Sequence, residues 1–112
     1  MEVISKVSFG DVKVRQAFEQ LPSKKFQEQQ LHKWIERAMH DLKANAFSGI
    51  QIPKRQIPKL YQVRFGPLEN LWKYNLPNAW RLIYTIKREE IVVLSIILEW
   101  LDHKDYERRF KY

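Results

Sequence analysis

The sequence predicts an α+β fold, in which two N-terminal helices cover one face of an antiparallel β-sheet. An apolar stripe at helical spacing runs through residues 24–46, and three strand-like segments follow one another between residues 71 and 100. Short connections between these segments indicate an antiparallel meander. The expected order is therefore β-α-α-β-β-β, folded as a two-layer sandwich.

Length and composition restrict the chain further. Its 112 residues fit a single domain over residues 1–112, and 45% hydrophobic residues are enough for a core. Cysteine is absent, which excludes a disulfide framework. The sequence shows neither a signal peptide nor an apolar run of membrane-spanning length, so we expect a cytoplasmic protein with no membrane partner.

The charge indicates the class of partner. Twenty Lys and Arg residues against 13 Asp and Glu give a net charge of +7. In one small domain, this excess favours a polyanion such as nucleic acid. The alternatives are a positive surface with no such role and an acidic protein partner.

The N-terminal elements follow from local patterns. Residues 2–9 alternate apolar and polar side chains, which predicts a short strand. Asp11 is placed to cap the first helix, and Ser23 to cap the second. The second helix is expected over residues 24–46, and Ser48-Gly49 follows its end.

Residues 50–67 have a different composition. They contain three prolines and no acidic residue, so we expect no helix there. The segment is predicted to be an extended, basic loop on the surface. Its four cations are Lys54, Arg55, Lys59 and Arg64.

Three strands are expected after this loop. Residues 71–76 and 80–87 alternate, and residues 91–100 are apolar on both faces, which is typical of a central strand. The tail, residues 101–112, is expected to be a short helix or an irregular segment.

Several kinds of site have no motif in the chain. The three glycines are not clustered, which leaves no phosphate-binding loop, and no Gly-x-Ser-x-Gly elbow occurs. His32 and His40 are eight residues apart, so we interpret them as surface or boundary residues, not as ligands. We therefore expect neither a metal nor a cofactor.

Arg81, His103 and Tyr106 are the candidates that remain for chemistry. Trp80 and Leu82 would pack on the helices, which places Arg81 on the opposite, uncovered face. There a guanidinium can hold a phosphate through two hydrogen bonds. His103 can act as an acid or a base, and Tyr106 can stack on a nucleobase or donate its hydroxyl proton. The alternative is an ordinary solvent-facing arginine and a solvated tail.

The stretch NLWKYNLPNAWRLIYTIKREEIVVLSIILEWLDHKDYERRF resembles the C-terminal half of RelE/ParE-superfamily toxins of type II toxin–antitoxin systems. The shared features are the aromatic-Arg-Leu-x-Tyr strand, the polar hairpin, the hydrophobic strand and the His-Lys-x-Tyr ending. The resemblance covers about residues 70–110, and extends more loosely to the paired N-terminal helices.

The resemblance implies a RelE-like fold and a ribosome-dependent, metal-free mRNA endoribonuclease that inhibits translation. It also implies a cognate antitoxin as partner in a hetero-oligomer, besides the ribosome and mRNA. Two alternatives stay open: a ParE-like toxin that blocks gyrase without cutting nucleic acid, and a non-catalytic RNA- or ribosome-binding module.

The family pattern also assigns residues. The catalytic set it implies is Arg81, His103, Tyr106 and Lys54, where a neighbouring cation would favour the neutral form of Lys54. The expected RNA contacts are Arg55, Lys59, Arg64, Lys73, Lys104, Arg108 and Arg109. Some members use a glutamate upstream, whereas here no acid lies between Asp41 and Glu69, and Glu69 fits that place poorly.

Overall fold

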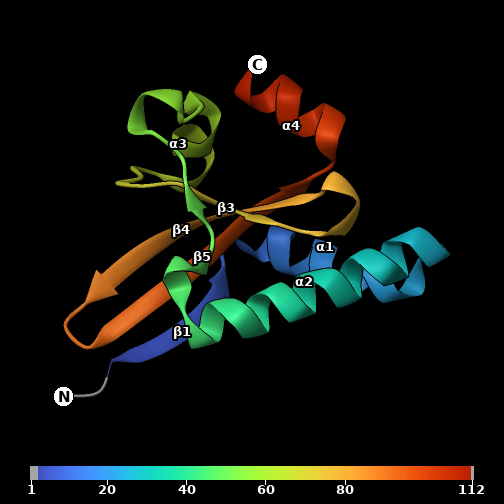
Figure 1. Cartoon of the computed structure of the whole chain (residues 1–112), viewed down its shortest axis with the longest axis horizontal. Helices are drawn as coiled ribbons and strands as arrows, with labels where there is room; N and C mark the ends of the chain where they lie inside the picture. The colour runs from blue at the N-terminus through green and yellow to red at the C-terminus, as the bar shows by residue number, and fades with distance from the viewer. Residues whose placement is uncertain (1–2, 112) are drawn as a thin grey trace.

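The computed structural model describes residues 3–111, and in this range it contains five strands and four α-helices. The strands are Ile4–Phe9 (β1), Ile50–Gln51 (β2), Trp72–Asn75 (β3), Arg81–Glu89 (β4) and Val92–Leu101 (β5). The helices are Val12–Gln20 (α1), Phe26–Ala44 (α2), Lys59–Phe65 (α3) and His103–Phe110 (α4). All five strands form one sheet in the order β1-β5-β4-β3-β2 (Figure 1).

The α+β class is confirmed, but the sheet is mixed and not antiparallel throughout. β3, β4 and β5 form the expected antiparallel meander. β1 instead runs parallel to β5, with Ile4 opposite Val92 and Phe9 opposite Ile97. Two helices separate β1 from the rest of the sheet, so no hairpin dictates its direction. The first residue of the strand predicted over residues 2–9 lies outside the described residues.

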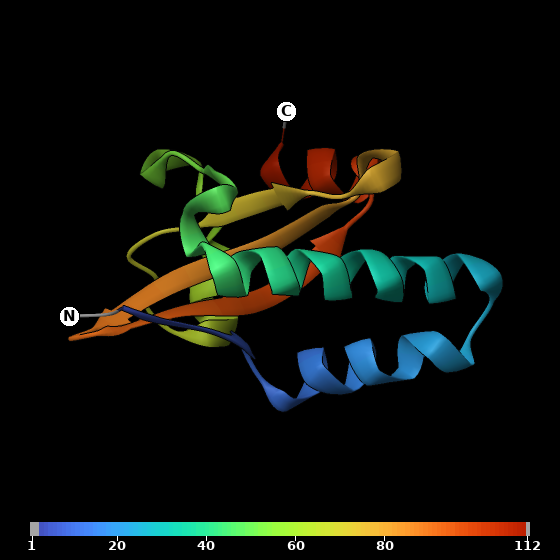
Figure 2. The same cartoon turned by 60° about the horizontal axis from the view of Figure 1, so that its bottom comes forward.

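One face of the sheet carries α1 and α2, as expected. The two helices lie side by side in opposite directions (Figure 2). Ile35 and Leu42 of α2 are fully buried against Leu82 and Tyr84 of β4. Asp11 caps α1 as predicted, since its carboxylate accepts a hydrogen bond from the Val14 N–H at 2.9 Å.

The second helix is slightly shorter than predicted, and its cap is different. α2 begins at Phe26, with Lys25 in the cap position and no side-chain cap. The Ser23 hydroxyl donates back to the carbonyl of Gln20 instead, at 2.8 Å. The helix ends at Ala44, and a 3₁₀ turn over Ala46–Ser48 follows it.

The prediction of a helix-free loop over residues 50–67 is wrong. β2, a 3₁₀ turn at Lys54–Gln56 and α3 occupy the segment. Pro58 takes the cap position immediately before α3, where its missing N–H costs no hydrogen bond. Gly66, at φ 85°, ends the helix one residue before Pro67. The prolines therefore flank a seven-residue helix and do not interrupt it.

The second face of the sheet is not uncovered, contrary to expectation. Ile83 of β4 and Leu98 of β5 contact Tyr61 of α3 together with Tyr106 and Phe110 of α4. All five side chains are buried. Figure 1 shows α3 and α4 on the far side of the sheet from α2. Helices thus pack on both faces of the sheet, so the two-layer description is incomplete.

No helix within residues 3–111 combines the length and the apolar character needed to cross a bilayer.

The cap at Asp11 gives a test of the N-terminal layer. Arg64 donates to the same carboxylate at 3.0 Å. We expect Asp11→Ala to lower the free energy of unfolding by about 1 kcal/mol, because the first turn of α1 loses its acceptor. Asp11→Asn keeps the cap and loses only a surface ion pair, so its loss should stay within about 0.5 kcal/mol. Urea unfolding measures both changes.

The same carboxylate predicts a dependence on pH. The Val14 N–H and the Arg64 guanidinium lower the pKa of Asp11 below its ordinary 3.8. Its stabilisation is therefore complete above that value and is lost as the pH falls through the lowered pKa. The difference in unfolding free energy between the parent chain and Asp11→Ala should shrink only on acidification below about pH 4. An equal difference at all acidic pH values would contradict this account of the cap.

Candidate functional site

The start of β4 and the start of α4 meet at one end of the sheet. Arg81 is the first residue of β4, and its partner in the antiparallel ladder is Leu101, the last residue of β5. Asp102 then caps α4 by accepting from the Asp105 N–H at 2.8 Å. His103, the first residue of α4, consequently lies beside Arg81, although 22 positions separate them in the chain.

Arg81 is held from three sides. Its Nη1 lies 3.2 Å from His103 Nδ1 and also donates to the carbonyl of Ala79. Its guanidinium carbon lies 4.7 Å from the centre of the Tyr106 ring, a cation–π geometry. Asn78 and Ala79 both adopt left-handed backbone angles, φ 57° and 61°, in the turn that carries this carbonyl. The guanidinium is therefore preorganised and half-buried.

His103 has a defined hydrogen-bond pattern. A guanidinium can only donate, so the imidazole Nδ1 facing Arg81 must accept. Nε2 then carries the proton and points it at the Glu107 carboxylate, 2.7 Å away on the next turn of α4. The imidazole itself is exposed. A carboxylate that orients a histidine through one ring nitrogen is a common feature of sites that move protons.

Tyr106 supports two cations at once. Lys73 Nζ donates to the Tyr106 hydroxyl at 3.0 Å and lies 5.0 Å from the ring centre. Lys73 reaches this place because it faces Ile83 in the β3–β4 ladder, while Trp72 and Tyr74 pack on the helix side, as the alternation predicts. Only 2% of Tyr106 is exposed, so its ring is not available to stack on a nucleobase.

The structure thus gathers Arg81, His103, Tyr106 and Lys73, but not the remaining predicted residues. Lys54, Arg55 and Lys59 are exposed on the 3₁₀ turn and the start of α3, and their side chains form no hydrogen bond or ion pair within residues 3–111. In the part of the chain that the structure describes, no hydrogen bond, ion pair or ring contact joins Lys54 to Arg81. Lys104 is also exposed, on α4.

Three of the predicted RNA-binding arginines have acidic partners. Arg64 pairs with Asp11 at the start of α1, and so lies away from Arg81. Arg109 binds both oxygens of Glu99, at 3.1 and 3.2 Å. Burial lowers the pKa of Arg109, but the Glu99 carboxylate outweighs burial and the net pKa is raised. Arg108 lies 3.7 Å from Asp105 and keeps an 80% exposed side chain.

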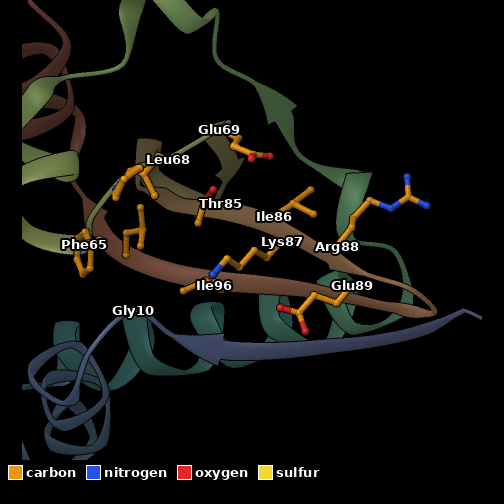
Figure 3. Close-up of a pocket in the computed structure, with 12 residues that line it drawn as sticks. Gly10, Phe65, Leu68, Glu69, Thr85, Ile86, Lys87, Arg88, Glu89 and Ile96 are labelled. Carbon is orange, nitrogen blue, oxygen red and sulfur yellow. The ribbon is translucent and has the colours of Figure 1, made fainter.

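A pocket of about 440 Å³ lies along the other half of β4. Figure 3 shows Phe65 and Leu68 at one end of it and Lys87 and Glu89 at the other. Glu69 also lines this pocket, so it does not supply the upstream carboxylate beside Arg81. None of the predicted catalytic or RNA-binding residues lines it.

Glu107 is the residue that sequence reasoning missed. Its signal was present, because His103 and Glu107 are four residues apart and would share one face of a helix. The sequence of the tail allows either a short helix or an irregular segment, and this spacing places the two side chains together only on a helix.

Comparison of the chain with protein-family models, curated proteins and solved structures finds no match. Within residues 3–111, no group of three or more His, Cys, Asp or Glu side chains could hold a metal ion.

The tautomer of His103 is a direct test of the site. At alkaline pH, ¹⁵N NMR of the imidazole should show Nδ1 unprotonated and Nε2 protonated, because Arg81 donates to the first and Glu107 accepts from the second. Arg81→Ala, with Glu107 intact, should leave Nε2 protonated. Glu107→Leu with Arg81 intact removes the acceptor and should weaken the preference. A dominant Nδ1–H form in the parent chain would contradict the geometry.

Proposed function

We propose that this chain is a RelE-like toxin of a type II toxin–antitoxin pair, which cleaves mRNA on the ribosome without a metal. The observation that carries the proposal is the contact of Arg81 with His103 and Tyr106, with Lys73 on the same ring. The net charge of +7 and the order of β1, α1, α2, β3, β4 and β5 support it.

The reaction needs only the RNA and protein side chains. The 2′-oxygen attacks the neighbouring phosphorus, the bond from phosphorus to the 5′-oxygen breaks, and a 2′,3′-cyclic phosphate and a free 5′-hydroxyl result. One proton leaves the 2′-hydroxyl and one reaches the 5′-oxygen. The protein must therefore orient the RNA backbone, stabilise the phosphorane charge and move two protons.

Arg81 would stabilise the additional negative charge. It is half-buried and held by the Ala79 carbonyl and the Tyr106 ring, so only its contact with His103 has to break when phosphate binds. Its Nε is buried and makes no hydrogen bond within the described part of the chain. Charge-assisted bonds from such a group favour the transition state most where solvent is excluded.

His103 would serve as the general base and Lys73 as the general acid. Phosphate binding to Arg81 would draw Nη1 away from His103 Nδ1, and the freed nitrogen could accept the 2′-hydroxyl proton. Glu107 on Nε2 would stabilise the imidazolium that forms. The Lys73 ammonium, which donates to the Tyr106 hydroxyl, would supply the proton to the 5′-oxygen. Tyr106 itself is the support for both cations.

The remaining cations differ in whether their side chains are free to contact RNA. Lys54, Arg55, Lys59, Lys104 and Arg108 are exposed and would contact RNA or ribosome. Arg64 pairs with Asp11 and Arg109 pairs with Glu99, so we assign both arginines a structural role and not RNA binding. An acidic antitoxin would compete for the exposed cations in the cytoplasm by forming a hetero-oligomer with the toxin.

Cleavage of mRNA on programmed ribosomes tests these roles. Arg81→Ala and His103→Ala should each lower the single-turnover rate by about 10²–10³, since each loses a transition-state interaction. Tyr106→Phe keeps the ring under both cations and should lose less than about 10-fold, whereas Tyr106→Ala should lose as much as Arg81→Ala. Mapping of 5′-hydroxyl ends and cyclic phosphates measures the cuts.

Arg88→Ala is the matched control, because Arg88 is an exposed arginine at the far end of the same strand. The Arg88→Ala variant should cleave mRNA at the same rate as the parent chain. Full cleavage and full growth arrest by the Arg81→Ala, His103→Ala double variant would overturn the proposal. Intact mRNA with accumulating DNA breaks would instead identify a gyrase-inhibiting toxin.

One observation favours a second function, a non-catalytic RNA-binding module. Both ring nitrogens of His103 are already engaged, and Arg81 already donates to a protein carbonyl. Such a module should bind RNA with an affinity that falls steeply with salt, and yield no cyclic phosphate on ribosomes. Arg81→Ala would then lower affinity without any turnover to lose.

A further inference from the structure

A second pocket lies between the first turns of α2 and the turn that joins β3 to β4. Its volume is about 550 Å³. Phe26, Trp34 and Trp80 contribute three aromatic rings to its lining. Phe26 is 71% exposed, which is unusual for a phenylalanine that serves only the core. In Figure 1 the two segments approach each other at the right of the molecule.

The charge of this pocket differs from that of the whole chain. The chain carries a net charge of +7, yet among residues 3–111 no Lys, Arg or His lines the pocket. Its one charged residue is Glu28. Oε2 of Glu28 is buried and has no hydrogen-bond partner within residues 3–111. A carboxylate oxygen left without a partner is costly, so a ligand that donates hydrogen bonds to the Glu28 carboxylate, once this side chain turns toward the pocket, would be favoured.

The other polar groups in the lining are amides. Gln27, Gln30 and Asn78 each offer both donors and acceptors. Rings that stack and amides that hydrogen-bond at an edge suit a planar heterocycle better than a flexible cation. The volume agrees, because a nucleoside fits a pocket of this size, whereas a single ammonium or guanidinium group would leave most of it empty.

We propose that this pocket binds a guanine base. A carboxylate only accepts hydrogen bonds, and guanine presents two adjacent donors, N1–H and the N2 amino group, on its Watson–Crick edge. Adenine and cytosine place a ring acceptor beside their amino group, which a carboxylate repels. Uracil offers one donor between two carbonyl oxygens. Guanine is therefore the base that Glu28 would select, with Trp34, Trp80 or Phe26 stacking on its face.

This site is separate from the one around Arg81. Trp80 and Arg81 are neighbours, but Trp80 packs on the core under α1 and α2, whereas Arg81 contacts α4 on the other face. Guanine binding can therefore be tested independently of nuclease activity, and the failure of one proposal does not affect the other. The base has two sources, a free guanine nucleotide or an unpaired guanine in RNA, and both present the same edge.

Titration with nucleoside monophosphates tests the site by binding alone. GMP should bind about 10-fold more tightly than AMP and IMP, because AMP lacks both donors and IMP lacks the amino group. The indole N–H resonances of Trp34 and Trp80 should shift, while those of Trp72 and Trp100, which do not line the pocket, stay in place. An oligonucleotide with one unpaired guanine that binds tighter than both GMP and the same oligonucleotide with adenine at that position would identify RNA as the source, and equal affinity of the two oligonucleotides would identify the free nucleotide.

Two variants and a control make the test specific. Glu28→Gln replaces an acceptor that suits both guanine donors with an amide, and should abolish the preference for GMP over IMP. Phe26→Ala changes an exposed side chain, so the chain should still fold, and it should weaken GMP about 10-fold through lost stacking. Glu36→Gln is the matched control, since Glu36 is an exposed acid farther along α2 that does not line the pocket.

Three outcomes would overturn the proposal. Equal binding of GMP, AMP and IMP would mean that only the phosphate is attracted. A preference for GMP that Glu28→Gln leaves intact would place the base elsewhere. Shifts at Trp72 or Trp100 with none at Trp34 and Trp80 would do the same.

Discussion

The antiparallel ladder between β4 and β5 fixes the candidate site. Arg81 opens β4 opposite Leu101, which closes β5, and α4 begins two residues later. This register places the start of β4 beside the start of α4, and so brings the guanidinium near the imidazole of His103. A shift of one residue would move every side chain of β4 to the opposite face, and Arg81 would then point into the core under α1 and α2. Burial on both faces of β4 makes such a shift costly, so the core holds the site in register.

The same strand separates two different environments. On one face, Leu82 and Tyr84 close the core with α1 and α2, and Trp80 reaches the aromatic pocket. On the other face, Ile83 packs with α3 and α4, and Arg81 contacts Tyr106. Alternation of side chains along one strand thus places an acceptor-lined aromatic pocket and a cationic cluster back to back. The strained turn at Asn78–Ala79 belongs to both, because Asn78 lines the pocket and the Ala79 carbonyl accepts from Arg81.

Sequence reasoning predicted the local elements well and some long-range contacts. β1, α1, α2 and the three C-terminal strands lie close to their expected residues, and Asp11 caps α1 as expected. The structure brings together Arg81, His103 and Tyr106, three residues that the sequence offered as candidates for chemistry. Several expectations were wrong, among them the uncovered second face of the sheet and the Ser23 cap of α2. α3 occupies the proline-containing loop, β1 pairs parallel to β5, and Tyr106 is a buried support and not an exposed stacking residue. The partners of Arg64 and Arg109 were not predicted at all.

The sequence by itself determined what depends on neighbours within a few residues: helical and strand periodicity, the cap at Asp11, the polarity of each strand face and the excess of positive charge. These are set by backbone geometry and by the free energy of burying one stripe of apolar side chains. Tertiary structure decided the direction of β1, the packing of α3 and α4 on the second face, and the partner of each cation. Those outcomes depend on which surfaces of the folded chain meet. The sequence around a basic residue does not show which acidic side chain or aromatic ring it will contact. Lys73 and Arg81 share one site because both contact the ring of Tyr106 on α4. Arg64 lies outside this site and pairs with the carboxylate of Asp11.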